Sequence, residues 1–378
     1  MKKGLALLVS MMMVLSLAAC GGGAPAAGGG ASAGAGSVSS GGGTASTAPA
    51  PVAGDSDEPL LFGLAMFDYA NNFTAYIRNG IMHHAAERGI ELIVTDGQNN
   101  QTVQNEQVDT MIARGVQVLM VNMVDSQSSS VIIEKARPHN IPIIFFNKNP
   151  SQEDLDSYDL CWYVGVDAAN QGKMQAEMII QAWEADQSKF DRNGDGILQY
   201  VLIQGDPGHS DTPLRTDAHL KAMDESGIQY DLLEMQPANW QTAAAKDLME
   251  AWIGKHGDAI ELVATLNDAM AIGAVEALRA NGLITDTEVK TWVVGINALP
   301  EASDLIRQGI QFGSILTNPT AQGVCVLDLA MNAAAGKFDD VTQGTDWVLL
   351  PDTSVRIPDV IVTQENVDVA IQAYIRAS

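Results

Sequence analysis

Residues 60–89 read LLFGLAMFDYANNFTAYIRNGIMHHAAERG, and the rest of the domain repeats the pattern of this stretch. An apolar run of strand length over 60–67 is followed by a segment in which Ile77, Ile81 and Ala85 fall four residues apart. The helical spacing stops at Gly89, and a glycine just past the last periodic residue is a common helix end. The stretch therefore predicts one strand followed by one helix.

This strand–helix unit recurs along the chain in two series. Val108, Met111 and Ile112 share a second helical face that ends at Gly115. Apolar runs predict further strands over 91–94, 116–123 and 141–146, and then over 199–203, 231–235, 262–266 and 291–296, with helices such as 242–253 and 269–280 between them. Such alternation is typical of parallel sheets covered by helices on both faces. Two series of about four strands predict two similar α/β lobes, with crossings between them near 165–168 and 318–319.

The composition narrows the classes of partner. Across 378 residues there are 46 Asp and Glu against 21 Lys and Arg, a formal net charge of −25. A surface this acidic repels phosphate backbones, which argues against nucleic-acid binding and against a polyanionic ligand. A neutral small molecule or a cation remains open. The three cysteines are too few for a disulfide scaffold and are wrongly spaced for a zinc site.

The N-terminus reads as a targeting segment followed by a linker. Lys2 and Lys3 precede an apolar run over 5–19, which is shorter than the roughly 20 residues of a membrane-spanning helix and fits a secretory signal. The run ends in LAAC at 17–20, which resembles a lipoprotein signal, so residues 1–19 would be removed and Cys20 would carry the lipid. An ordinary signal peptide with a chance cysteine is the alternative. Residues 20–56, rich in Gly, Ala and Ser, predict a flexible tether to a domain outside the cell.

Polar and aromatic side chains follow the expected strands of both series. In open parallel sheets, ligands bind outside the carboxyl ends of the strands. The side chains found there are Asn71, Phe73, Asn147, His209, Asp211, Arg215, Trp240, Asn267 and Asn297. Amides and aromatic faces suit a neutral polyhydroxylated ring. Each residue alone also fits a turn, a cap or a packing role, so their convergence from both lobes is what favours a binding site.

A loop over 191–199 has the spacing of a calcium site. Its sequence DRNGDGILQ matches the first nine positions of an EF-hand loop. The candidate ligands are Asp191, Asn193, Asp195, the carbonyl of Ile197, and Gln199. The twelfth position should be a glutamate, but it is Leu202. The stretch is therefore a degenerate loop, a loop that takes its last acid from elsewhere, or a plain surface turn.

Five blocks in order along the chain resemble one family. They are FFNK at 145–148, LDSYD at 155–159, GDPGH at 205–209, NDAMA at 267–271 and ALPEA at 298–302. From about residue 60 to 375 the sequence is similar to the bacterial glucose/galactose-binding proteins, substrate-binding proteins of ABC sugar transporters with the type I periplasmic binding protein fold. The resemblance implies an α/β fold of two Rossmann-like lobes with parallel sheets joined by a hinge. The expected lobes are 57–166 plus 318–353, and 167–317 plus 354–378.

The resemblance also implies roles for individual residues. Phe73 and Trp240 would stack on the two faces of a sugar, and Glu261 would complete a structural Ca²⁺ site. The polar contacts that match the family are Asn147, His209, Asp211, Arg215 and Asn267. Three positions depart from it, because Asn71 and Asn297 stand where the family has aspartates, and Thr317 replaces an asparagine. We therefore expect altered or weaker binding of galactose and glucose, with a pentose or a modified hexose as the alternative ligand.

The expected function is that of a lipid-anchored receptor on the outer face of the cell membrane, and not that of an enzyme. It would capture a monosaccharide between the lobes and deliver it to a membrane permease. A sugar sensor that feeds a chemoreceptor or kinase is the alternative. A transcriptional regulator would need a basic N-terminal helix-turn-helix, which is not found in this sequence. A glycosidase would need two carboxylates that flank the sugar, and His209 with Asp211 has no second carboxylate at a known spacing.

Overall fold

The computed structural model of the chain describes residues 59–374. The expected signal over 1–19, the lipidated Cys20 and the tether over 20–56 lie outside these residues. Within the described part, no helix has both the length and the apolar character needed to cross a membrane.

The first sheet is six-stranded and parallel throughout, in the order β11-β5-β4-β3-β1-β2. Five of its strands come from the first third of the domain, and β11 returns from near the C-terminus. The strands are β1 (Leu61–Met66), β2 (Glu91–Asp96), β3 (Val118–Val121), β4 (Ile143–Phe146), β5 (Cys161–Gly165) and β11 (Ser354–Arg356).

The second sheet is also six-stranded, in the order β12-β10-β9-β8-β6-β7. Its strands are parallel except for β12, which runs antiparallel to β10 at the edge of the sheet. The strands are β6 (Leu198–Gln204), β7 (Tyr230–Pro237), β8 (Leu262–Thr265), β9 (Trp292–Asn297), β10 (Gly313–Thr317) and β12 (Asp359–Thr363).

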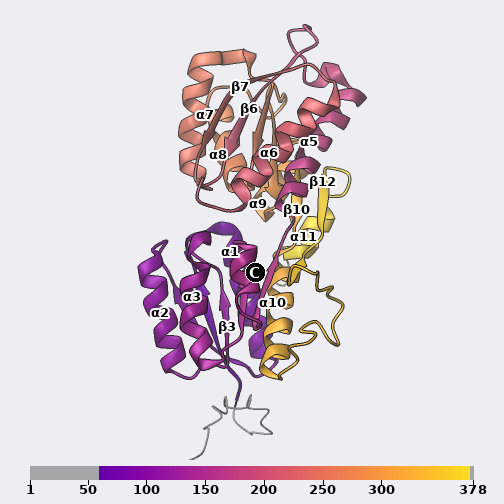
Figure 1. The fold of residues 1–378 in the computed structure, drawn as a ribbon. Helices are drawn as coiled ribbons and strands as arrows, with labels where there is room; N and C mark the ends of the chain where they lie inside the picture. Colours follow the sequence, from indigo (N-terminus) through magenta and orange to yellow (C-terminus); the bar gives the residue numbers. More distant parts are fainter. Residues whose placement is uncertain (1–58, 375–378) are drawn as a thin grey trace, which may run out of the picture. The chain divides into compact units, whose positions relative to one another are not determined.

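Helices connect and cover the strands of both sheets (Figure 1). With the first sheet lie α1 (Asn72–Glu87), α2 (Gln101–Ala113), α3 (Ser129–Ala136), α4 (Gln152–Asp156) and α10 (Pro319–Ala334). With the second lie α5 (Ala168–Ala185), α6 (Asp211–Ser226), α7 (Thr242–His256), α8 (Asp268–Ala280) and α9 (Pro300–Arg307). The last helix, α11 (Asp368–Tyr374), contacts both α9 and α10. Short 3₁₀ turns occur at Ser126–Ser128, Arg137–His139, Gln187–Lys189 and Gly257–Ala259.

The apolar spacing of the sequence accounts for the packing of the helices. Ile77 and Ile81 on α1 are fully buried against strands of the first sheet and against α10. Cys325 on α10 belongs to the same core, whereas Cys161 lies in the core on the other face of that sheet. Both thiols are free and buried, so each acts as a small apolar side chain.

The expected α/β fold of two parallel-sheet lobes is confirmed, with corrections in detail. All eight expected strands are present, but each sheet has six strands rather than about four. The sequence reading missed β5, β10, β11 and β12, because they are short and all four mix apolar residues with Gly, Ser, Thr, Asp or Arg. The second lobe was expected to resume at residue 354. That boundary is wrong, because Ser354–Arg356 pairs with β5 of the first sheet and the chain crosses only between Arg356 and Asp359.

Candidate ligand-binding site

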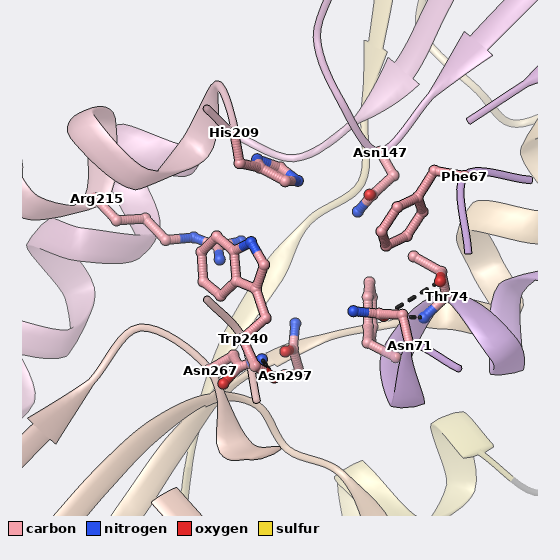
Figure 2. Close-up of a pocket in the computed structure, with 10 residues that line it drawn as sticks. Phe67, Asn71, Thr74, Asn147, His209, Arg215, Trp240, Asn267 and Asn297 are labelled. Atoms are coloured by element: carbon pink, nitrogen blue, oxygen red, sulfur yellow. Dashed lines mark hydrogen bonds between the residues drawn. The ribbon is translucent and has the colours of Figure 1, made fainter. Parts of the chain in front are cut away.

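Side chains from both sheets line one pocket at the carboxyl ends of the strands (Figure 2). The empty space among them is about 380 Å³, including solvent at its mouth. The lining residues are Phe67, Asn71, Phe73, Thr74, Asn147, His209, Arg215, Trp240, Asn267 and Asn297.

Eight of the nine side chains expected from the sequence line this pocket. The exception is Asp211, which is buried next to Arg215 and is not among the lining residues. Sequence reasoning missed Phe67 and Thr74. Phe67 is the last residue of the apolar run over 60–67, so its position at the end of β1 was the available signal.

Asn71 caps helix α1 from its N-terminal side. Its Oδ1 accepts a hydrogen bond from the backbone N–H of Thr74 at 3.0 Å and another from the Thr74 hydroxyl at 3.1 Å. Asparagine is among the best residues for this capping position because its oxygen satisfies an otherwise free N–H of the first turn. The cap fixes the side chain, and the amide nitrogen is left facing the pocket (Figure 2).

Asn147 follows β4 in a left-handed backbone conformation with φ of 65°. Asparagine adopts this conformation more readily than most residues. The hydroxyl of Tyr163 donates to the carbonyl of Asn147 at 2.8 Å, and Asn122 Nδ2 donates to its side-chain oxygen at 3.2 Å. These bonds hold the residue at the edge of the pocket.

His209 is a neutral side chain with a defined tautomer. The backbone N–H of Asp211 donates to its Nδ1 at 3.1 Å, so the ring hydrogen is on Nε2. Burial lowers the pKa of His209 to about 4, and the nearby Asp211 only partly opposes this shift. The 3.8 Å separation between Nδ1 and the Asp211 carboxylate is therefore not an ion pair at neutral pH. His209 offers the pocket an N–H donor.

Arg215 lies at the centre of a buried hydrogen-bond network. It pairs with Asp211 at 3.2 Å and donates to the carbonyl of Leu266 at 3.1 Å. Its Nε and Nη2 both donate to Oε1 of Gln171, at 2.9 and 2.6 Å. The amide nitrogen of Gln171 donates in turn to Thr317 at 2.7 Å and to Asp359 at 2.6 Å. The network thus connects a pocket side chain to the three chain segments that pass between the lobes.

Trp240 stands on a strained turn after β7. Asn239 and Trp240 both have positive φ, of 52° and 65°. The indole ring lies against the backbone at Gly205, where an added Cβ would come within 2.0 Å of the ring, so only glycine fits. The His209 ring meets the indole edge-on at 5.3 Å between centroids. The indole nitrogen is buried and has no hydrogen-bond partner within residues 59–374.

Asn267 and Asn297 complete the pocket from the ends of β8 and β9. Asn267 caps α8, because its Oδ1 accepts from the N–H of Met270 at 2.9 Å. Asn297 sits on a strained turn with φ of 110°. The buried Asp268 holds that turn, since its carboxylate accepts from the N–H of Leu299 at 2.9 Å and from the hydroxyl of Ser314 at 2.9 Å. Burial raises the pKa of Asp268 to about 7.

A family model described as the periplasmic binding protein domain matches residues 62–338. The chain belongs to this family. One relative is the D-galactose/methyl-galactoside binding periplasmic protein MglB of Haemophilus influenzae, which is 39% identical over 80% of this chain and 89% of its own length. A second is a putative rhizopine-binding protein of Rhizobium meliloti, 27% identical over 73% of this chain and 84% of that protein.

A solved structure shows the same fold as this periplasmic binding protein. It is an ABC transporter solute binding protein from Bacillus halodurans with bound myo-inositol, with a TM-score of 0.69 and 25% identity. The match covers 85% of this chain and 100% of that one. The fold expected from the sequence is therefore found in a protein that binds a polyhydroxylated ring.

In this periplasmic binding protein the loop 191–199 folds into a tight turn against Glu261. Asp191 accepts from the N–H groups of Gly194 and Gly196 at 2.7 and 2.9 Å. Glu261, 1% exposed, accepts from the N–H groups of Arg192 and Gln199 at 2.8 and 3.1 Å, which ties it to both ends of the loop. The acid that the loop lacks is therefore beside it.

Two amides of the loop point their nitrogens at Asp195. The side-chain nitrogens of Asn193 and Gln199 donate to Asp195 Oδ2, at 2.9 and 2.8 Å. A different group, His83, His84 and Glu87 on α1, brings three potential ligand atoms within 4.8 Å of one another.

Proposed function

We propose that this chain is the substrate-binding component of an ABC sugar importer, which captures a monosaccharide in the pocket and delivers it to a membrane permease. The observation that carries the proposal is the pocket itself, where aromatic and polar side chains converge from the strand ends of both sheets. The 39% identity to a protein named for binding D-galactose and methyl-galactoside supports a sugar as the ligand.

The aromatic side chains supply the faces of the site. Phe73 comes from the first turn of α1 and Trp240 from the turn after β7, so they reach the pocket from different lobes. The C–H face of a pyranose packs well on an aromatic plane, and this contact excludes water from the ring. A ligand held by residues of both lobes stabilises their approach, because it gains contacts only when the lobes come together.

Binding without catalysis fits the chemistry of the pocket. Retaining and inverting glycosidases use two carboxylates on either side of the scissile bond. None of the ten lining residues is an aspartate or a glutamate. The ring of His209 is neutral, and its Nδ1 accepts a hydrogen bond from the backbone N–H of Asp211. The side chains can orient a sugar, but they lack the acid and the nucleophile that hydrolysis needs.

The N-terminal sequence supports a lipid anchor and, through it, a partner in the membrane. The LAAC motif at 17–20 supports lipid attachment at Cys20, and the linker over 20–56 would hold the binding domain close to the outer face of the membrane. A permease in that membrane would then receive the loaded domain. Delivery of the sugar signal to a chemoreceptor or kinase is compatible with the same binding event.

Calorimetric titration of the purified protein against aldohexoses and aldopentoses tests this function. The proposal predicts one-to-one binding of a monosaccharide, and a Trp240→Ala variant should bind it at least about tenfold more weakly because one stacking face is lost. A Trp292→Ala variant is the matched control, because Trp292 lies at the start of β9 and outside the pocket. Absence of binding for monosaccharides of every class would overturn the proposal.

The loop 191–199 would hold a structural Ca²⁺. Asp191, Asn193, Asp195 and Gln199 would supply side-chain oxygens, Ile197 its carbonyl, and Glu261 the final carboxylate. Three carboxylates with amide and carbonyl oxygens form a donor set that a hard divalent cation prefers. Calcium should raise the melting temperature of the wild-type protein, and a Glu261→Gln variant should lose most of that increase. An equal increase in both proteins would contradict the assignment.

A further inference from the structure

We propose that the pocket prefers a monosaccharide that carries a carboxylate over a sugar whose polar groups are all hydroxyls. This inference rests on the proposed function and specifies its ligand. The observation behind it is that the pocket presents mainly N–H groups to its interior. Figure 2 shows the amide nitrogens of Asn71, Asn147 and Asn297 turned toward the open centre.

The orientation of the Asn71 amide is settled by a backbone partner. The N–H of Thr74 can only donate, so the atom of Asn71 that lies 3.0 Å from it must be the oxygen. The amide nitrogen therefore faces the pocket. The oxygen of Asn267 is settled in the same way, because the N–H of Met270 donates to it at 2.9 Å, and its amide nitrogen donates to the carbonyl of Trp240 at 3.5 Å.

The orientation of Asn147 follows through one intermediate residue. The carbonyl of Phe146 can only accept, so the atom of Asn122 that lies 3.2 Å from it is the amide nitrogen. The same nitrogen lies 3.2 Å from the side chain of Asn147, which must present its oxygen there. The amide nitrogen of Asn147 is left for the pocket. Three of the four lining asparagines thus have their oxygens in use inside the protein.

His209, Trp240 and Arg215 also present N–H groups to the pocket. His209 carries its hydrogen on Nε2, because Nδ1 accepts from the backbone. The indole N–H of Trp240 is buried without a partner in the described chain. The guanidinium of Arg215 lines the same space. A buried donor that stays unpaired costs binding free energy.

A neutral hexose matches such a pocket poorly. Every sugar hydroxyl brings its own O–H, which needs an acceptor, and no carboxylate lines this pocket. A carboxylate has no hydrogen of its own and offers about four lone-pair positions to N–H donors. The guanidinium of Arg215 lines the pocket, and the ammonium of the buried Lys148 lies 4.6 Å from the ring centroid of the lining Phe67.

Matched sugar pairs test the inference by calorimetry on the purified protein. The probes are D-galactose, D-galacturonate and D-galactonate, and the corresponding glucose set. We expect at least one acid to bind about tenfold or more tightly than its neutral hexose, because charge-assisted hydrogen bonds are about twice as strong as neutral ones. A preference for the uronate or for the aldonate tells whether the acid is bound as a ring or as an open chain.

The outcomes separate this inference from the proposed function. If galactose or glucose binds as tightly as both of its acids, the inference is overturned while the sugar-binding function stands. If no sugar or sugar acid binds, both are overturned.

An Asn71→Asp variant tests the donor that the inference depends on. Aspartate caps a helix as well as asparagine does, so folding is preserved, but the pocket gains an anionic acceptor in place of an N–H donor. The ratio of acid to neutral-hexose affinity should fall at least about tenfold. Asn100→Asp is the matched control, because Asn100 caps α2 with the same chemistry and does not line the pocket. An unchanged ratio in Asn71→Asp would contradict the inference.

Discussion

In the first lobe Asn71 is held by a neighbour in the sequence, whereas in the second lobe Arg215 is held by residues from distant parts of the chain. Asn71 bonds to Thr74, three residues away, and Asn147 is held within the edge of one sheet. Arg215 is held by Gln171, 44 positions away, and through it by Asp359, 188 positions beyond Gln171. The position of Asn71 is a product of local structure, and the position of Arg215 is a product of tertiary packing.

This difference assigns different roles to the two sides. Side chains on the first lobe can change their chemistry while the helix cap is kept, as an exchange between asparagine and aspartate at position 71 would do. Arg215, Gln171 and Asp359 form one buried unit, and a change in any of them affects the others. We therefore expect ligand preference to be set mainly on the first lobe, and the coupling of binding to lobe movement mainly on the second.

Replacement of Arg215 should produce the largest effect. An Arg215→Met variant leaves Asp211 buried without its partner, and we expect the free energy of unfolding to fall by about 3–5 kcal/mol. Chemical denaturation measures this. Arg307→Met is the control, because Arg307 makes only exposed ion pairs, and it should cost less than about 1 kcal/mol. Equal losses for the two variants would remove the distinction drawn for the second lobe.

The link through Gln171 should matter for both stability and binding. A Gln171→Leu variant loses the bonds to Arg215, Thr317 and Asp359, and we expect a loss of about 1–3 kcal/mol in the free energy of unfolding together with about tenfold weaker sugar binding. The matched control is Gln322→Leu, since Gln322 is also buried but bonds to Val164 in the first lobe. It should lose stability and keep its affinity. Weaker binding in both variants would show that the effect is not specific to the network.

Removal of the first-lobe cap should have a smaller effect on stability. An Asn71→Ala variant loses one capping bond to α1, and we expect the free energy of unfolding to fall by about 1 kcal/mol. The free energy of unfolding should fall by a similar amount in Asn100→Ala, because Asn100 also caps a helix, α2. Denaturation curves of both variants test this. A loss at Asn71 as large as the loss at Arg215 would mean that the first side of the pocket is not locally held.

The pH dependence of stability should also carry a signal from the second lobe. Burial raises the pKa of Asp359 to about 7, above its ordinary value of 3.8. The folded protein therefore holds this proton more tightly than the unfolded chain, so the free energy of unfolding falls as the pH rises from about 4 to about 7. An Asp359→Asn variant should lose part of that slope. Denaturation at several pH values between 4 and 8 tests this, and an unchanged slope would contradict the assignment.

The sequence was informative wherever function depends on the residue after a strand. Asn71, Asn147, Asn267 and Asn297 were found because each lies at the end of a buried apolar run or within a few residues of it. Gln171 could not be found in this way, since it lies inside the first turn of α5 and contacts Arg215 only through the packing of α5 on α6.

Thr317 marks the limit of reasoning from resemblance. The resemblance implied that it replaces a sugar contact, but Thr317 is 1% exposed, is not among the lining residues, and binds Gln171. The sequence also could not predict the direction in which each side-chain amide points, because that direction depends on which backbone atom lies next to it in the folded protein. Composition and spacing identify the residues of the pocket, and only the packed structure tells donors from acceptors.

A crystal structure of the protein with its bound monosaccharide tests the central claim most directly. We predict a sugar ring between Phe73 and Trp240, with its acceptor oxygens within hydrogen-bond distance of the amide nitrogens of Asn71 and Asn147. A ligand bound elsewhere on the domain, or a ligand hydroxyl that donates to the oxygen of Asn71, would contradict the account.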